Sequence, residues 1–153
     1  RCSGAITKWH ELKQYNQFVN VQGDMPNITL QMIERCIEWL QYYPISTVWT
    51  DMPKEMQNNP DSVKMVRAGD QCLWFGRGMT GYGHWHLGIY GYRRNALELY
   101  SNLEVTEEET IEQLEQLRWL KSGWQIGCSS VYFKGIEINS PEDVDIWHKQ
   151  NSQ

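Results

Sequence analysis

The chain has 153 residues with 14 basic and 19 acidic side chains, which gives a formal net charge of −5. Its length suits a single domain over residues 1–153 that buries roughly two-thirds of its unfolded surface. The acidic balance argues against a general phosphate-binding surface. No apolar run approaches the ~20 residues that a membrane span needs, and no signal peptide opens the chain. We therefore expect a soluble protein whose membrane contact, if any, is peripheral.

The first third of the chain predicts one helix. Residues 1–26 are polar and aromatic, and they indicate no definite element. Beyond them, apolar residues recur at the spacing of one helix face, at Leu30, Ile33, Cys36, Ile37 and Leu40. Thr29 can cap the start of this helix and Pro44 prevents its continuation, so we expect a helix over 29–42. Residues 51–62 form a loop by composition.

The middle of the chain predicts a small antiparallel sheet. A short strand is expected over 71–75, followed by a glycine-rich connection over 76–83 that lacks the Lys-Ser/Thr ending of a nucleotide-binding loop. In residues 84–90, Trp85, Leu87 and Ile89 alternate with polar residues, which is typical of a half-buried strand. Residues 96–100 alternate too, so we expect them to complete a hairpin.

The last third predicts three helices. Thr106 and Glu109 form a capping box ahead of an apolar stripe that ends near Gly123. A short helix is expected to start near Cys128. Ser140-Pro141 followed by acids predicts a last helix over 141–149.

Cys128 and His86 are the candidate catalytic residues. A thiol at a helix N-terminus has a lowered pKa, and an imidazole beside it lowers the pKa further. If the apolar faces of strands 84–90 and 96–100 share one core, Glu98 lies on the same side as His86 and could orient the imidazole. The plainer interpretation is a structural cysteine, and Cys72 is a second, weaker nucleophile candidate.

The wider pattern around these residues resembles a known family. Arg67-Ala68-Gly69-Asp70, an apolar strand and His86-Leu87-Gly88-Ile89-Tyr90 are similar to the H-box of the lecithin-retinol-acyltransferase-like proteins, which are permuted relatives of NlpC-type papain-like thiol hydrolases. The run from Cys128 to Gly135 resembles the family's cysteine block. The pattern departs from the family at Ala68, where proline is usual, and at Gly127, where asparagine is usual. The compact form is most similar to the picornaviral 2A proteins of parechovirus and kobuvirus type.

The resemblance implies an α+β fold, in which a small antiparallel sheet packs on helices. Residues 66–136 would form the permuted papain-like core and residues 1–60 a helical addition. It implies His86 as base, Cys128 as nucleophile and Glu98 as third member, without a cofactor or a metal. We expect a viral non-structural protein of the host cytoplasm that acts in replication or host interaction, binding a host protein or viral RNA. An active thiol hydrolase or acyltransferase on lipid or amide substrates is the alternative.

Two metal sites are further alternatives. His84 and His86 flank Trp85 as in the motif of metal-dependent rolling-circle nickases, although the late helix lacks their nucleophilic tyrosine. A zinc site formed by Cys72, His84, His86 and Cys128 would lack finger-like spacing. The four cysteines are widely spaced without a CxxC pair, which favours free thiols in a reducing compartment.

Overall fold

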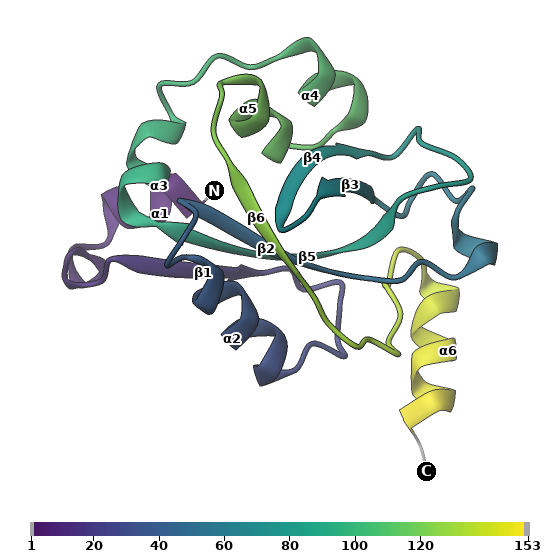
Figure 1. Ribbon diagram of the computed structural model, residues 1–153. Coiled ribbons are helices and arrows are strands. Elements are labelled where there is room, and N and C mark those ends of the chain that lie inside the picture. Colours follow the sequence, from purple (N-terminus) through teal and green to yellow (C-terminus); the bar gives the residue numbers. More distant parts are fainter. Residues whose placement is uncertain (1, 152–153) are drawn as a thin grey trace.

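The computed structural model describes residues 2–151, which are organised around one six-stranded sheet (Figure 1). The strands lie in the order β1-β5-β2-β6-β4-β3. Their bounds are β1 (Gln17–Val21), β2 (Ile45–Thr50), β3 (Lys64–Ala68), β4 (Gln71–Gly76), β5 (His84–Arg93) and β6 (Ile126–Ser130). Only the β2–β6 pairing is parallel among the described pairings. The helices are α1 (Cys2–Lys8), α2 (Leu30–Trp39), α3 (Arg94–Tyr100), α4 (Glu107–Glu112), α5 (Gln116–Lys121) and α6 (Pro141–Asn151), with 3₁₀ turns η1 (His10–Gln14) and η2 (Lys54–Met56).

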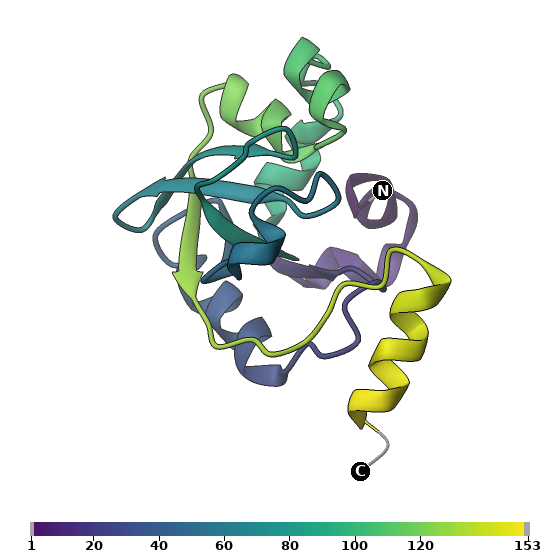
Figure 2. The same ribbon diagram turned by 90° about the vertical axis from the view of Figure 1, so that its right-hand side faces the viewer.

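Strand β5 is the centre of the sheet. It pairs with β2 along one edge, and it pairs with β1 and β3 at different points along the other edge. Because β3 also pairs with β4, the sheet curls back on itself (Figure 2). The alternation over residues 84–90 predicted a half-buried strand, and this prediction is wrong. Layers of structure cover both faces, so seven consecutive residues from Trp85 to Gly91 are buried.

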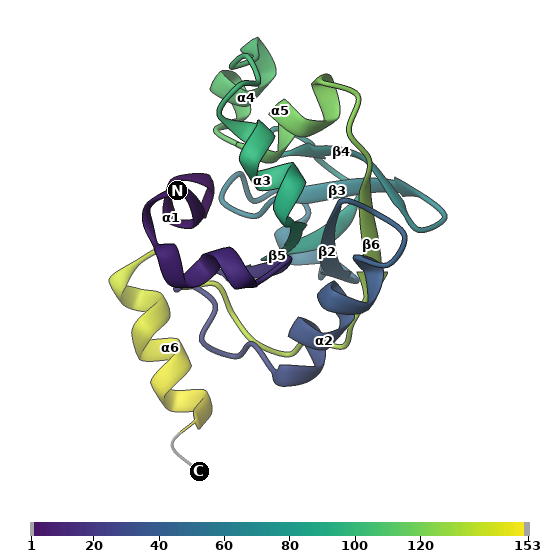
Figure 3. The ribbon, with the colours of Figure 1, turned by 90° about the vertical axis from the view of Figure 1, so that its left-hand side faces the viewer.

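Helices cover both faces of the sheet (Figures 1 and 3). Helix α2 packs on β2 and β5 and encloses an apolar cluster of Met32, Cys36, Val48, Trp85, Leu87 and Ile89. Helices α1, α3, α4 and α5 lie on the opposite side, where a second cluster includes Ile45, Phe75, Tyr90, Leu117 and Trp119. His86 projects toward this second cluster, since its ring centroid is 5.1 Å from that of Phe75.

Several elements are confirmed. The helix expected over 29–42 is α2, the strand expected over 71–75 is β4, and the helix expected over 141–149 is α6. The Thr106 side chain accepts a hydrogen bond from the Glu109 N–H, as a capping box requires. These elements have strong local signals, because their apolar spacing and caps lie within the element itself.

Two expected elements around the candidate site are wrong. Residues 96–100 belong to helix α3, not to a second hairpin strand, because Ala96 and Leu97 are both buried and Arg94 pairs with Glu98 one turn later. Cys128 lies in the middle of β6, not at the start of a helix. Gly127 beside it is required there, because an added Cβ would lie 2.3 Å from the Tyr43 ring.

The expected α+β fold with a permuted papain-like core is therefore not the fold of this chain, since its cysteine helix is a strand. Residues 1–60, expected as a helical addition, contribute α1 and α2 and also the sheet strands β1 and β2. Within residues 2–151, no helix is both long and apolar enough to cross a membrane.

Candidate functional site

A cavity of about 580 Å³ lies between the sheet and the helices of the α3–α5 side. Its walls come from distant parts of the chain, which include α1, the end of β1 and the turn after it, the loop after β4, the strand β5, the helix α3, the α4–α5 connection and α5. The polar side chains that line it include Asn20, Gln22, Asp24, Arg77, His86, Tyr90, Tyr92, Glu115 and Gln116. Most of these groups are uncharged donors or acceptors, and Arg77 supplies the positive charge.

His86 lines this cavity, and one of its ring nitrogens, Nε2, is already hydrogen-bonded to Thr47. Thr47 Oγ1 donates to the Ile89 carbonyl at 2.7 Å, so the same hydroxyl must accept from His86 Nε2 at 2.8 Å. The ring is therefore the Nε2–H tautomer, and its Nδ1 atom is a hydrogen-bond acceptor. Burial, followed by the positive charge of Arg77, lowers the pKa of His86 to about 3. The imidazole is neutral near pH 7, which makes Nδ1 available to a ligand hydroxyl.

Tyr90 supplies a complementary donor. Its hydroxyl is buried and has no hydrogen-bond partner within residues 2–151, although the residue lines the cavity. Burial, then the nearby Tyr92, raises the pKa of Tyr90 well above its usual value, so the hydroxyl keeps its proton. A buried donor without a partner costs free energy, and a bound ligand that accepts from it would recover that cost.

Aromatic rings form an apolar side of the cavity. Tyr90 stacks on Tyr92 with ring centroids 6.0 Å apart, and Trp119 packs on Tyr92 and Tyr100. Such rings suit the C–H faces of a polyhydroxylated ligand, while amides and hydroxyls bind its polar edge.

Gln22 reaches the cavity because Gly88 leaves space for it. A Cβ at Gly88 would lie 2.0 Å from Gln22 Oε1, so glycine at this position allows the amide to lie directly on β5. Asp24 follows in the same turn and is exposed at the cavity rim. Its carbonyl accepts from the Ile138 N–H at 2.8 Å, which ties the C-terminal segment to this turn.

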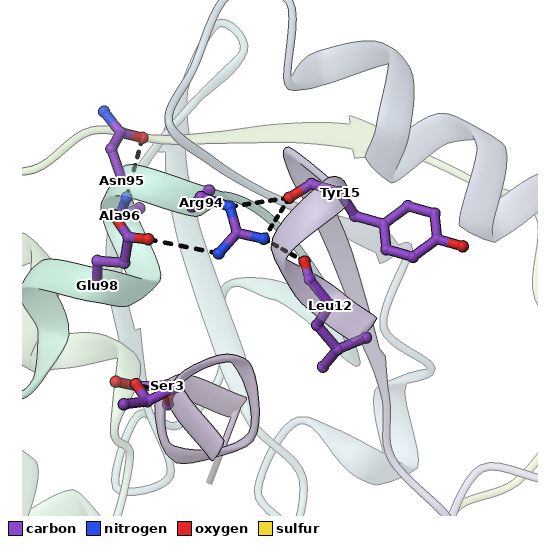
Figure 4. A network of polar contacts seen from close by, with 8 residues as sticks. Ser3, Leu12, Tyr15, Arg94, Asn95, Ala96 and Glu98 are labelled. Carbon is purple, nitrogen blue, oxygen red and sulfur yellow. Dashed lines mark hydrogen bonds and ion pairs between the residues drawn. The ribbon is translucent and has the colours of Figure 1, made fainter. Parts of the chain in front are cut away.

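The three predicted catalytic residues do not come together. Glu98 lies on α3, where its carboxylate pairs with Arg94 at 3.4 Å (Figure 4). Arg94 also donates to the carbonyls of Tyr15 and Leu12 and so fastens the N-terminal segment to α3. Glu98 does not line the cavity that contains His86. The expectation that Glu98 orients the His86 imidazole is wrong, because Thr47 is the side chain that is hydrogen-bonded to the ring.

Cys128 is separated from His86 by Thr47. Cys128 is paired with Thr47 across β2 and β6, and no hydrogen bond within residues 2–151 joins it to His86. A hydrogen bond with Cys72 lowers the Cys128 pKa, and burial raises the pKa of Cys72. Both thiols are buried in the sheet core, where a reagent cannot reach them without local opening.

Thiol labelling tests this placement. We expect iodoacetamide to modify Cys2 first, because it is the partly exposed cysteine, while Cys36, Cys72 and Cys128 are buried. Labelling of Cys128 should be at least about tenfold slower in the native state, since it requires opening of β6. Peptide mass spectrometry over time measures this order, with urea-unfolded protein as the control. Cys128 reacting first would contradict the buried placement.

The proposed metal sites also lack their ligand sets. His84 Nε2 accepts from Arg67 Nε at 3.2 Å and its ring packs on Trp49, whereas His86 is bonded to Thr47. No cluster of three or more His, Cys, Asp or Glu side chains suited to a metal occurs within residues 2–151.

Sequence reasoning found His86 but missed most of the cavity. Gln22 and Asp24 fell within residues 1–26, which indicated no definite element, and Arg77 was expected in the glycine-rich connection over 76–83. The available signal for Arg77 was a single cation inside a glycine-rich segment that leads to the histidine strand. Gln116 carried no local signal, because it fits an ordinary helix position. Tyr90 lies an even number of residues from His86 in the alternating run 84–90, which was the available signal that the two share a face.

Known proteins similar to this chain are cytidylyltransferases. The 3-deoxy-manno-octulosonate cytidylyltransferase of Rickettsia akari (strain Hartford) is 36% identical over 136 residues, which covers 84% of this chain and 55% of the relative. That of Rickettsia rickettsii (strain Sheila Smith) is 37% identical over 136 residues, covering 84% and 56%. The chain thus spans about half the length of the curated relatives it matches. No family model matches the chain.

Solved structures agree with these relatives. CMP:2-keto-3-deoxy-manno-octonic acid synthetase, in a complex with CTP, superposes with a TM-score of 0.87 at 26% identity, covering 99% of this chain and 66% of the synthetase. The inositol-1-phosphate CTP transferase from T. maritima gives a TM-score of 0.63 at 9% identity, covering 96% of this chain and 58% of that one, which is a likeness of fold alone.

These matches overturn the expected relationship to H-box/NC, lecithin-retinol-acyltransferase-like and NlpC-type proteins. The fold over residues 2–151 is that of the corresponding part of the cytidylyltransferases. The expected viral 2A protein, the thiol hydrolase or acyltransferase and the nickase are wrong, since the relatives are bacterial nucleotidyl-transferring enzymes. The similarity between Cys128 and a catalytic cysteine was accidental.

Proposed function

We propose that this chain forms the acceptor-binding part of a cytidylyltransferase that acts on 3-deoxy-manno-octulosonate or a closely related sugar acid. The observation that carries the proposal is the cavity on the α3–α5 side of the sheet. It combines the Arg77 guanidinium, neutral hydrogen-bonding groups, an aromatic wall and the two carboxylates of Asp24 and Glu115. The guanidinium matches a sugar carboxylate, the polar groups match hydroxyls, and the aromatic wall matches the carbon skeleton. The Rickettsia relatives support the class of reaction.

In this proposal each cavity residue has a binding or orienting role. The Arg77 guanidinium pairs with the sugar carboxylate. His86 Nδ1 accepts from a sugar hydroxyl, and Tyr90 donates to a sugar oxygen. Because His86 is neutral and Thr47 fixes its tautomer, the acceptor atom is available over the whole physiological pH range. The aromatic wall excludes water from the bound acceptor.

Calorimetric titration of the full chain with 3-deoxy-manno-octulosonate tests the proposal. We expect saturable binding of one sugar acid per chain, and no binding of a neutral hexose such as mannose at equal concentration. Changes in the NMR chemical shifts of Tyr90 and His86 when the sugar acid is added would locate the ligand in the cavity. Absence of sugar-acid binding, or equal binding of mannose, would contradict the proposal.

Arg77→Gln is expected to weaken binding of the sugar acid by about 10- to 100-fold, because the variant loses a charge-assisted contact worth roughly 1.5–3 kcal/mol. The matched control is Arg35→Gln, which removes the same charge from the exposed face of α2. Dissociation constants by calorimetry measure the difference. Equal effects of the two substitutions would show that overall charge, and not the cavity, governs affinity.

A further inference from the structure

The backbone of Arg77 is held by two charged side chains from other elements. Glu112 Oε2 accepts from the Arg77 N–H at 2.6 Å and from the Gly78 N–H at 3.1 Å. The Lys64 ammonium donates to the Arg77 carbonyl at 3.0 Å. Glu112 is the last residue of α4, 35 positions further along the chain, so the contact joins the loop after β4 to the helical side of the cavity.

The Glu112 carboxylate also lies against the two glycines beside Arg77. A Cβ at Gly76 would lie 3.4 Å from Glu112 Oε1, and one at Gly78 would lie 3.5 Å away, which are ordinary contact distances. Lys64 is fully buried, and its ammonium also donates to the Asn59 carbonyl. A buried lysine needs such partners, because an unpaired charge inside a protein is costly.

Two glycines further along the loop adopt backbone conformations that side chains disfavour. Gly81 and Gly83 have positive φ angles of 77° and 102°. A carboxylate that accepts from two adjacent N–H groups forms charge-assisted bonds, which are shorter and stronger than neutral ones. Arg77 lines the cavity, where its positive charge acts on His86, and its guanidinium also donates to the Asp61 carbonyl.

We propose that Glu112 is a positioning residue: by binding the N–H groups of Arg77 and Gly78, it fixes the guanidinium of Arg77 in the cavity and so sets the preference for an anionic over a neutral sugar. The inference rests on the proposed function, because the anion is the carboxylate of the sugar acid. Glu112 does not line the cavity, so it acts through Arg77.

The first test does not depend on any ligand. Hydrogen exchange of the Arg77 and Gly78 amides is followed by NMR in the wild type, in Glu112→Ala and in the control Glu108→Ala. Glu108 is on the same helix and pairs with Lys121 instead. We expect exchange at both amides to be at least about tenfold faster in Glu112→Ala alone. Unchanged exchange rates would show that Glu112 does not hold the Arg77 and Gly78 amides, and this result would overturn the positioning role for any ligand.

The second test separates positioning from a general structural role. Dissociation constants are measured for 3-deoxy-manno-octulosonate and for its methyl ester, which lacks the charge. Glu112→Ala should weaken the acid by about tenfold and leave the ester unchanged, while Glu108→Ala changes neither. In an Arg77→Gln background, Glu112→Ala should cause no further loss for the acid, because the two residues act as one unit.

The outcomes distinguish the two proposals. If amide exchange is faster in Glu112→Ala but the wild type does not bind the acid, the proposed function is contradicted. The finding that Glu112 holds the Arg77 and Gly78 amides would remain valid. Equal weakening of acid and ester by Glu112→Ala, or additive losses in the double variant, would show that Glu112 only stabilises the fold and would overturn the positioning role.

Discussion

Phe75→Ala is expected to lower the free energy of unfolding by about 3–5 kcal/mol, the usual cost of truncating a buried aromatic ring. Phe75 is completely buried and packs edge-on against His86. The variant also removes the ring that packs against His86, so binding of the sugar acid should weaken as well. Urea unfolding of both proteins, monitored by tryptophan fluorescence, measures the loss of stability.

Leu73→Ala is the matched control on the same strand. The β3–β4 register shifts at this point, so Leu73 opposes no partner residue and is 49% exposed. Its truncation should cost about 0.5 kcal/mol or less, as is usual for surface substitutions. If both substitutions cost the same, β4 would not present Phe75 to the core as described.

Mild acid is expected to destabilise the protein through His86. The folded-state pKa of about 3 lies below the ordinary value of 6.5, so the unfolded chain binds a proton that the native state rejects. Stability from this group is fully present above about pH 6.5 and is lost as the pH falls toward 3. Linkage gives a loss of about 3 kcal/mol between pH 7 and pH 4.5. His84 adds a smaller effect of the same sign, since burial also lowers its pKa.

His86→Gln isolates this contribution, because glutamine does not titrate in this range. The free energy of unfolding of the variant, measured in urea at several pH values, should depend less on pH than that of the wild type by about 3 kcal/mol over the same interval. Two parallel pH profiles would mean that the pKa of His86 is the same in the native and unfolded states, and they would contradict the lowering of that pKa by burial.

Local patterns in the sequence were sufficient for elements that carry their own signals. The apolar stripe and caps of α2, the serine-proline start of α6 and the alternation in β5 could all be read within one segment. His86 was found for the same reason, since it is a polar residue inside an alternating apolar strand. The environment of His86 could not be predicted, because the helices that cover it come from distant parts of the chain.

Elements defined by tertiary contacts could not be predicted this way. The apolar alternation in residues 96–100 covers only five residues and fits a strand and a short helix equally. The burial of the adjacent Ala96 and Leu97 favours the helix. Strand β6 contains Gly127 and two serines, which read as a loop or helix start until the parallel pairing with β2 is known. Arg77 depends on Glu112, a contact between segments that no local pattern connects.

The position of β2 between β5 and β6 has a consequence for how the chain is made. Both neighbours of β2 follow it in the sequence, the nearer beginning at residue 84 and the farther at residue 126. During synthesis, β2 therefore leaves the ribosome with two unpaired edges, which are templates for wrong pairing with other chains. The parallel partner β6 closes the second edge only when synthesis has reached residue 126, so this sheet cannot be completed before then.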